Sequence, residues 1–250
     1  MLAIERRNQI LATIEVSKSV HVADIAKKFS VTDETIRRDL EKLEKEGLVI
    51  KTYGGAILAE GLSSNAPYRV RFETNKSQKE IIAQKIVQLV NPKDSIIIDA
   101  SSTCVKIAKS LSKIRQLTII TNSVDILVEC ASIENIRIIS TGGHLSGSSL
   151  SLVGQSACSA IERFTADMTI FSCKGVDLKK GITESSLAEA EVKRAMAKSA
   201  KEVLLAIDSS KFDKLAFASS VEVSSITKVV SDFFPNKWKT YFEERGIVCI

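Results

Sequence analysis

From Ile82 onward, short apolar runs alternate with longer amphipathic stretches along the chain. The runs are rich in Ile, Val and Leu and cover residues 95–100, 117–121, 136–140, 168–173, 202–208 and 227–232. Near-continuous apolar runs are typical of strands that are buried on both faces of a sheet. Strands that alternate with helices predict βαβ units and a parallel sheet covered by helices on both sides. Residues 80–250 are therefore predicted to form a large, mostly parallel α/β domain.

Residues 4–46 have helical periodicity instead, so a separate small domain is predicted over residues 1–58. We expect helices over 4–16 and 22–29, and a third that begins after Thr32. Thr32 is a suitable N-cap, because its hydroxyl can accept a hydrogen bond from a free amide of the next helical turn. In that third helix Ile36, Leu40 and Leu43 lie on one stripe, which predicts a buried face.

A helix, a tight turn and a second helix with polar N-terminal residues predict a helix-turn-helix that enters the major groove of DNA. Gly47 is expected to end the second helix, and residues 48–50 and 56–57 are expected to pair as a β-ribbon, or wing. The candidate DNA-binding residues are Thr32, Thr35, Arg37, Arg38, Lys42, Lys51, Tyr53, Gly54 and Gly55. An adjacent arginine pair is more often a solvated helix face, but its position after a cap and before a wing favours DNA contact.

Charge and cysteine content limit the classes of function. The net charge of the chain is +5, yet the first 60 residues carry ten basic and ten acidic side chains, so any DNA contact depends on where the charges lie. Five scattered cysteines without a CxxC pair argue against disulfides and a zinc site, and we expect no metal or cofactor. No apolar run is long enough to cross a bilayer, which predicts a cytoplasmic, nucleoid-associated protein without membrane contact.

Polar loops follow five of the predicted strands, and the carboxyl ends of parallel strands are where open α/β sheets bind ligands. The candidate ligand-binding residues are Asp99, Ser101, Ser102, Thr103, Thr121, Asn122, Ser123, Gly142, Gly143, Lys174, Asp177, Asp208 and Lys211. Residues 101–103 open a helix, and hydroxyls with free amides at a helix N-terminus form an anion site. Each loop alone is more often a simple helix cap. Together they predict a small anionic ligand that also carries hydroxyl groups.

Residues 6–57 resemble the DeoR-type (deoxyribose-repressor) helix-turn-helix, on the strings RRNQIL, TIRRDL and YGGAI. The resemblance continues through Arg71, Asn75 and Lys79 of a predicted linker, residues 59–79, into the C-terminal domain. It implies a Rossmann-like sensor similar in fold to ribose-5-phosphate isomerase. It also implies a repressor of carbohydrate uptake or catabolism genes that is released from double-stranded operator DNA by a phosphorylated sugar. Ser101 and Ser102 depart from the family's Asp-Ala-Gly-Thr-Thr loop, and Cys173-Lys174-Gly175 departs from its fourth loop.

Two other functions remain open on the sequence. The chain could be a sugar-phosphate isomerase-like enzyme with an added DNA-binding domain, although Lys174 stands where the isomerase loop clusters carboxylates. It could also be an architectural DNA-binding protein without a ligand, which the polar loops disfavour. A small reading domain without net charge is expected to bind DNA weakly alone, so a homo-oligomer, a dimer or a tetramer, is predicted.

Overall fold

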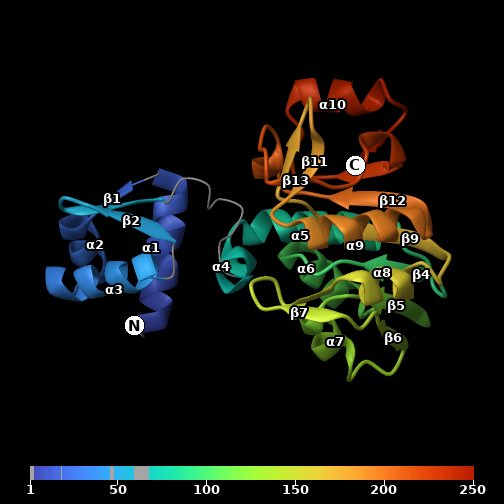
Figure 1. Ribbon diagram of the computed structural model, residues 1–250, viewed down its shortest axis with the longest axis horizontal. Helices are drawn as coiled ribbons and strands as arrows, with labels where there is room; N and C mark the ends of the chain where they lie inside the picture. The colour runs from blue at the N-terminus through green and yellow to red at the C-terminus, as the bar shows by residue number, and fades with distance from the viewer. Residues whose placement is uncertain (1–2, 18, 46–47, 59–67) are drawn as a thin grey trace. The chain divides into compact units, whose positions relative to one another are not determined.

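The computed structural model describes residues 3–17, 19–45, 48–58 and 68–250 (Figure 1). The chain divides into two compact units, Met1–Thr74 and Asn75–Ile250, called here the N-terminal and C-terminal units. The predicted linker, residues 59–79, overlaps both of them. Residues 59–67 lie outside the described part, and the rest contains helix α4 (Tyr68–Glu73) and the first turn of α5 (Lys76–Val87).

The N-terminal unit packs three helices against a small antiparallel sheet. Its elements before α4 are α1 (Ala3–Ser17), β1 (Ser19–His21), α2 (Val22–Phe29), α3 (Asp33–Lys45), β2 (Val49–Thr52) and β3 (Gly55–Leu58). The strands lie in the order β1-β3-β2. The predicted helices and wing are confirmed, and Ile36, Leu40 and Leu43 are buried in the core of this unit. The predicted helix end at Gly47 falls outside the described residues.

The turn between α2 and α3 gives this unit its helix-turn-helix geometry. Ser30 adopts a left-handed conformation with φ 54°, and its amide donates to the carbonyl of Lys27. The Val31 amide donates to the carbonyl of Ala26. These carbonyls of the last turn of α2 therefore accept hydrogen bonds before the chain changes direction. Thr32 then precedes α3, and its Oγ1 accepts a hydrogen bond from the Thr35 amide at 3.3 Å, as predicted for an N-cap.

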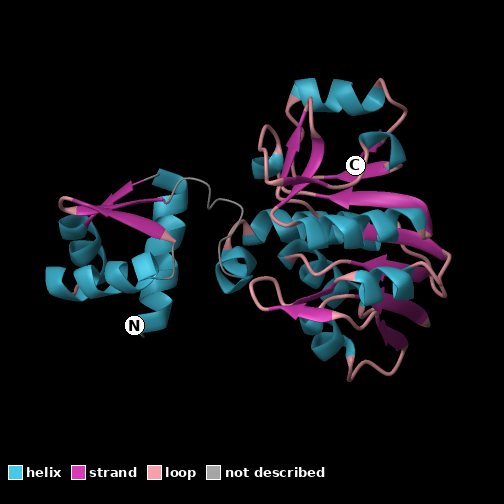
Figure 2. Ribbon diagram, in the orientation of Figure 1, coloured by secondary structure: helices cyan, strands magenta, loops and turns pink. Residues whose placement is uncertain are grey.

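The C-terminal unit is built around a seven-stranded sheet in the order β15-β14-β12-β9-β4-β5-β6, and every pairing in it is parallel (Figure 2). Its strands are β4 (Ser95–Ile98), β5 (Leu117–Thr121), β6 (Ile136–Ser140), β9 (Ala166–Phe171), β12 (Ala200–Ala206), β14 (Lys228–Val230) and β15 (Val248–Cys249). The six predicted strands are confirmed, with ends that differ by a few residues. Sequence reasoning missed β15, whose two residues are too short a run to detect.

Helices connect the strands of this sheet and cover it. They are α5, α6 (Ser102–Leu111), α7 (Val124–Cys130), α8 (Gln155–Ile161), α9 (Leu187–Lys198) and α10 (Asn236–Glu243). Strand order runs from β4 toward β6 on one side and from β9 toward β15 on the other. Because parallel crossovers are right-handed, this reversal places α6 and α9 on opposite faces of the sheet. The carboxyl ends of β4 and β9 therefore meet at a topological switch point.

Two small sheets lie outside the main one. β7 (His144–Ser146) pairs with β8 (Ser151–Val153), and β10 (Gly175–Asp177), β11 (Gly181–Glu184) and β13 (Ala218–Ser219) form an antiparallel sheet. The prediction that Gly175–Asp177 belong to a loop was wrong, because these residues pair with β11. No helix within the described ranges is long and apolar enough to cross a bilayer.

Candidate nucleic-acid interface and ligand site

The outer face of α3 carries the predicted DNA-contacting side chains. Arg37, Arg38 and Lys42 are exposed, Thr35 is half-buried, and Thr32 lies exposed at the start of the helix. Arg38 Nε lies 3.1 Å from Glu34 Oε1, one turn earlier on the same face. Both side chains are largely in water, so this pair is weak and easily exchanged for a phosphate contact. The face can therefore present two guanidinium groups to a DNA groove.

The wing between β2 and β3 places Lys51, Tyr53 and Gly54 in solvent. Gly54 has φ 93°, a conformation that a side chain would strain. At Gly55 a Cβ would lie 2.0 Å from the carbonyl oxygen of Val20, so its glycine is required by the close approach of β1. Gly55 was predicted as a DNA contact. The structure shows that close packing against β1 also requires a glycine at this position. Lys51 Nζ pairs with Glu41 Oε1 at 3.3 Å.

In the C-terminal unit, the loop after β4 opens α6 beside the switch point. Ser101 is the N-cap of α6, and its hydroxyl accepts a hydrogen bond from the Cys104 amide at 3.1 Å. The Ser101 amide donates to Asp99 Oδ1 at 3.1 Å. These contacts leave the amides of Ser102 and Thr103 among the orphan donors of the helix start. An oriented pair of amides at the positive end of a helix can hold an anion.

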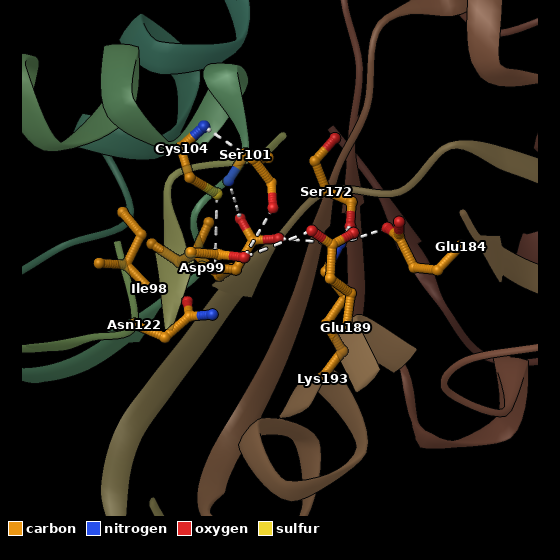
Figure 3. Close-up of polar contacts among 12 residues, drawn as sticks. Ile98, Asp99, Ser101, Cys104, Asn122, Ser172, Glu184, Glu189 and Lys193 are labelled. Carbon is orange, nitrogen blue, oxygen red and sulfur yellow. Dashed lines mark hydrogen bonds and ion pairs between the residues drawn. The ribbon is translucent and has the colours of Figure 1, made fainter. Parts of the chain in front are cut away.

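A buried lysine lies next to this loop (Figure 3). Lys193 Nζ, on α9, lies 3.0 Å from Asp99 Oδ2, 2.6 Å from the carbonyl oxygen of Ser172, and in close contact with Glu184 Oε1. Glu189, one turn earlier on α9, lies beside them. We call Lys193, Asp99, Glu184 and Glu189 the Lys193 cluster. It joins the ends of β4, β9 and β11 to the first turns of α9.

The Lys193 cluster has one lysine and three carboxyl groups, all within a buried region. This composition sets the direction in which the pKa of each group is shifted. Burial opposes ionisation of Asp99, but Lys193 and hydrogen bonds from Cys104 and Ser101 hold the pKa of this carboxyl below its ordinary value. Burial raises the pKa of Glu184, and Glu189 adds to that effect while Lys193 opposes it. Burial would lower the pKa of Lys193, but Asp99 and Glu184 raise it overall. Lys193 therefore stays protonated, and Glu184 is the carboxyl that protonates more readily.

The loop after β5 contributes an amide with an unused acceptor. The side chain of Asn122 is buried, and its Nδ2 donates to the carbonyl of Leu152 at 3.1 Å. Its Oδ1 is also buried and, within the described chain, has no hydrogen-bond partner. Figure 3 shows Asn122 close to Ile98 and Asp99. A buried polar atom without a partner is rare in native proteins, so it marks a place where a ligand or a water donates.

Other predicted residues of these loops have contacts within the fold. Thr121 Oγ1 donates to the carbonyl of Ile98 at 2.8 Å, and Ser123 Oγ caps α7 by accepting from the Ile126 amide at 3.2 Å. Gly142 and Gly143 have φ values of 65° and 118°. A Cβ on Gly143 would lie 2.7 Å from the Val153 carbonyl oxygen, so β8 requires a glycine there.

The last group of predicted residues follows β9 and β12 in the chain, and one of them, Asp177, ends strand β10. Asp177 Oδ1 accepts hydrogen bonds from the amides of Lys179 and Lys180, both at 2.9 Å, and so stabilises the β10–β11 turn. Asp208 is buried, and its Oδ1 accepts from Asn75 Nδ2 at 2.9 Å. Lys174 and Lys211 are half-buried.

Cys173 lies in the same region as Lys174, at the end of β9. Its thiol is buried, and burial raises its pKa to about 12. A thiol with so high a pKa is not a nucleophile at neutral pH, and Cys173 instead packs as a small buried residue of the hydrophobic core.

Sequence reasoning missed Lys193, Glu184 and Glu189, which are far from Asp99 in the chain. One signal was present. Lys193 lies three residues after Ala190 and three before Met196, so it falls on the buried face of its helix. A lysine on such a face needs buried acceptors. Nothing in the sequence says which acceptors these are.

The N-terminal unit is a winged helix-turn-helix, which is a DNA-binding fold. The C-terminal α/β unit has a topological switch point, the place where open α/β sheets bind ligands. A family described as the DeoR-like helix-turn-helix domain matches residues 6–61, and the DeoR C terminal sensor domain matches residues 74–233. The chain belongs to the DeoR family of DNA-binding transcriptional regulators.

Relatives match along nearly the whole chain. An uncharacterized HTH-type transcriptional regulator of Bacillus subtilis, YulB, is 37% identical over 93% of this chain and 90% of its own. The HTH-type transcriptional regulator GolR of Listeria innocua is 32% identical over 95% of this chain and 93% of its own. The glycerol-3-phosphate regulon repressor of Escherichia coli is 29% identical over 94% and 93%.

Solved structures with related folds are more distant. A ribose 5-phosphate isomerase in complex with phospho-erythronic acid has a TM-score of 0.42 and 14% identity, over 55% of this chain and 54% of that chain. The eIF2B delta subunit of Chaetomium thermophilum has a TM-score of 0.48 and 14% identity, over 65% and 58%.

Proposed function

We propose that this regulator represses carbohydrate uptake or catabolism genes and that a phosphorylated sugar releases it from its operator. Among its relatives are a glycerol-3-phosphate regulon repressor and a putative aga operon transcriptional repressor, both from Escherichia coli. These names support a role in the metabolism of sugars and related phosphates. An L-fucose operon activator of Haemophilus influenzae, 31% identical, is also a relative, so the sign of regulation is part of the proposal.

Two features that lie together at the switch point carry the proposed site. One is the start of α6, which offers orphan amides to an anion, and the other is the Lys193 cluster, which has three carboxyl groups around one lysine. The phosphate of the sugar binds the amides of Ser102 and Thr103 and the hydroxyl of Thr103. The sugar hydroxyls donate to Asn122 Oδ1, which is buried without a partner, and to the carboxylates of the Lys193 cluster. Lys174 and Lys211 add positive charge near the ends of β9 and β12. This division of labour suits a ligand with an anionic end and a hydroxyl-rich end.

The same site is proposed to bind without turnover. A general base must be unprotonated and within reach of the proton that it removes. Lys193 stays protonated because Asp99 and Glu184 raise its pKa, and Asp99 is a weak base because Lys193 holds its pKa below the ordinary value. Incubation of the protein with pentose and hexose phosphates, followed by analysis for isomerised product, tests this point. Product formation at a rate that depends on Glu184 would favour the isomerase-like alternative.

Operator binding is proposed to need more than one copy of the chain. A winged helix-turn-helix reads few bases alone, and paired half-sites need a protein with matching symmetry. We therefore propose that the working form is a homo-oligomer that acts on DNA in the cytoplasm. Sedimentation at the concentration that shifts operator DNA measures its mass, and a monomer under those conditions contradicts this part.

A thermal-shift screen tests the ligand class. The panel contains pentose phosphates, hexose phosphates, amino-sugar phosphates, glycerol 3-phosphate and inorganic phosphate, with the unphosphorylated sugars as matched controls. A ligand at a hundred times its dissociation constant adds about 2.7 kcal/mol of stability, which is easily detected. We expect one sugar phosphate to raise the melting temperature and its unphosphorylated sugar to have no effect. If the free sugars stabilise equally well, the anion site is not used.

A further inference from the structure

A buried ion pair crosses the core of the N-terminal unit. Arg6 Nε lies 2.5 Å from Asp39 Oδ2, and Arg7 Nη1 lies 3.7 Å from Asp39 Oδ1. The side chains of Arg6 and Asp39 are only 11% and 5% exposed. Arg6 belongs to α1 and Asp39 to α3, so the pair joins the first helix of the unit to the helix that carries Arg37 and Arg38.

Asp39 occupies a position where an apolar residue would pack. It lies on the inner face of α3 beside Ile36, Leu40 and Leu43, all of which are buried. A buried ion pair is often no more stable than apolar side chains of similar volume, because both charges lose their hydration. Stability alone therefore does not explain a charged pair at this position.

The need to fix the rotation of α3 about its axis does explain the charged pair. Apolar contacts have no direction, so a stripe of Ile and Leu tolerates small rotations of a helix about its axis. A charge-assisted hydrogen bond has a preferred distance and angle and permits one rotation. Successive helical residues are about 100° apart, so Arg37, two residues before Asp39, lies about 160° from it. Fixing Asp39 against α1 therefore places Arg37 on the side of α3 almost opposite this contact.

We propose that Arg6 and Asp39 are positioning residues that set the rotation of α3 and thereby determine which DNA sequence is read. Contacts to base edges depend on the angle at which each side chain enters the groove, whereas contacts to phosphates mainly fix affinity and tolerate small rotations. Loss of the pair should therefore reduce discrimination between operator and random DNA more than it reduces binding to random DNA.

The test replaces the pair by apolar residues in the full chain. Arg6→Met/Asp39→Leu removes one positive and one negative side chain, so the net charge and the electrostatic part of DNA binding are kept. Operator DNA is selected from a random pool by the wild-type protein. Affinities for it and for a random duplex are measured by fluorescence anisotropy at one salt concentration, beside thermal melts. We expect an unchanged or higher melting temperature and about a tenfold fall in the ratio of the two affinities, the size of one lost base contact.

A control and a second variant keep the result decisive. Ile14→Val shortens a buried side chain of α1 without touching the pair, so it lowers stability and should leave the affinity ratio unchanged. Asp39→Asn keeps the shape and one acceptor but loses the charge, so the ratio should fall by less than in the double variant. A folded double variant, or a folded Asp39→Asn variant, that discriminates as well as the wild type overturns the proposal.

Discussion

Both units of the chain bury charged side chains, but the two groups differ in balance and in position. In the N-terminal unit, the buried Asp39 of α3 faces two arginines of α1. In the C-terminal unit, Lys193 faces Asp99, Glu184 and Glu189 at the carboxyl edge of an open sheet. The first group has every carboxylate matched by a cation, and the second has more carboxylates than cations.

The difference indicates two uses of buried charge. In the first group the one carboxylate is fully paired, by two arginines of α1, and holds α3 against α1. The second group gathers more carboxylates than cations at a sheet edge, next to the orphan amides of a helix start. A sugar phosphate has an anion at one end and hydroxyl donors at the other. Its phosphate would accept hydrogen bonds from the helix start, and its hydroxyls would donate to the carboxylates.

The largest effect is expected from Lys193→Met. It leaves Asp99 and Glu184 buried without their cation, and breaking a buried pair in this way costs about 3–5 kcal/mol. The free energy of unfolding of the C-terminal unit is measured by urea titration with the fluorescence of Trp238, the only tryptophan of the chain and a buried residue of this unit. Lys201→Met is the matched control, because Lys201 pairs with Asp167 in solvent and its loss should change stability little. Equal effects of the two substitutions would contradict the account.

A smaller effect is expected on DNA from Arg37→Ala. A base-reading arginine contributes about 1–3 kcal/mol, and its loss relaxes specificity at one position. Arg38→Ala should weaken operator binding by no more than this, because the Arg38 guanidinium exchanges a weak contact with Glu34 for its contact with DNA. Anisotropy titrations with operator DNA compare the two variants. An Arg38 variant that binds more weakly than the Arg37 variant would reverse this assignment.

The smallest effect, and one that depends on pH, is expected from Glu184→Gln. Burial raises the pKa of Glu184 in the folded protein, so its ionised form destabilises the fold at neutral pH. Glutamine removes that penalty, so stability at pH 7 should stay equal or rise. The advantage should vanish as the pH falls through the pKa of Glu184, where the wild-type carboxyl is protonated.

Asp99→Asn should show the opposite pH dependence. The pKa of Asp99 is lowered in the fold, so its carboxylate stabilises the protein above its ordinary pKa of 3.8, and this contribution is lost as the pH falls. The substitution should therefore destabilise most near pH 7 and least in acid. Urea titrations of both variants from pH 7 down to below 3.8 make the comparison, because the Asp99 contribution is lost only below that pH. Parallel curves for the two variants would show that the cluster does not divide its charge as described.

The sequence was sufficient for the architecture and for the loops that meet at one edge of the sheet. Continuous apolar runs such as 95–98 are typical of strands buried on both faces, and a parallel sheet brings all their following loops to one edge. The side-chain contacts were less predictable. The hydroxyls of Ser101 and Ser123 cap helices, as the simpler interpretation held. Lys193 was missed because its partners come from β4 and β11, and only the fold brings these together.

The central claim is that the phosphate of the effector binds at the start of α6, and Thr103→Val tests it most directly. The side chain of Thr103 is buried, and valine keeps its shape while removing the hydroxyl. Operator DNA is titrated with the wild type and the variant, without and with the sugar phosphate that stabilises the wild type most in the thermal-shift screen. The account predicts equal operator affinity without the sugar phosphate, and release of the variant only at concentrations about tenfold higher or more, the effect of one lost hydrogen bond to a charged group. Release of both proteins at the same concentration would contradict it.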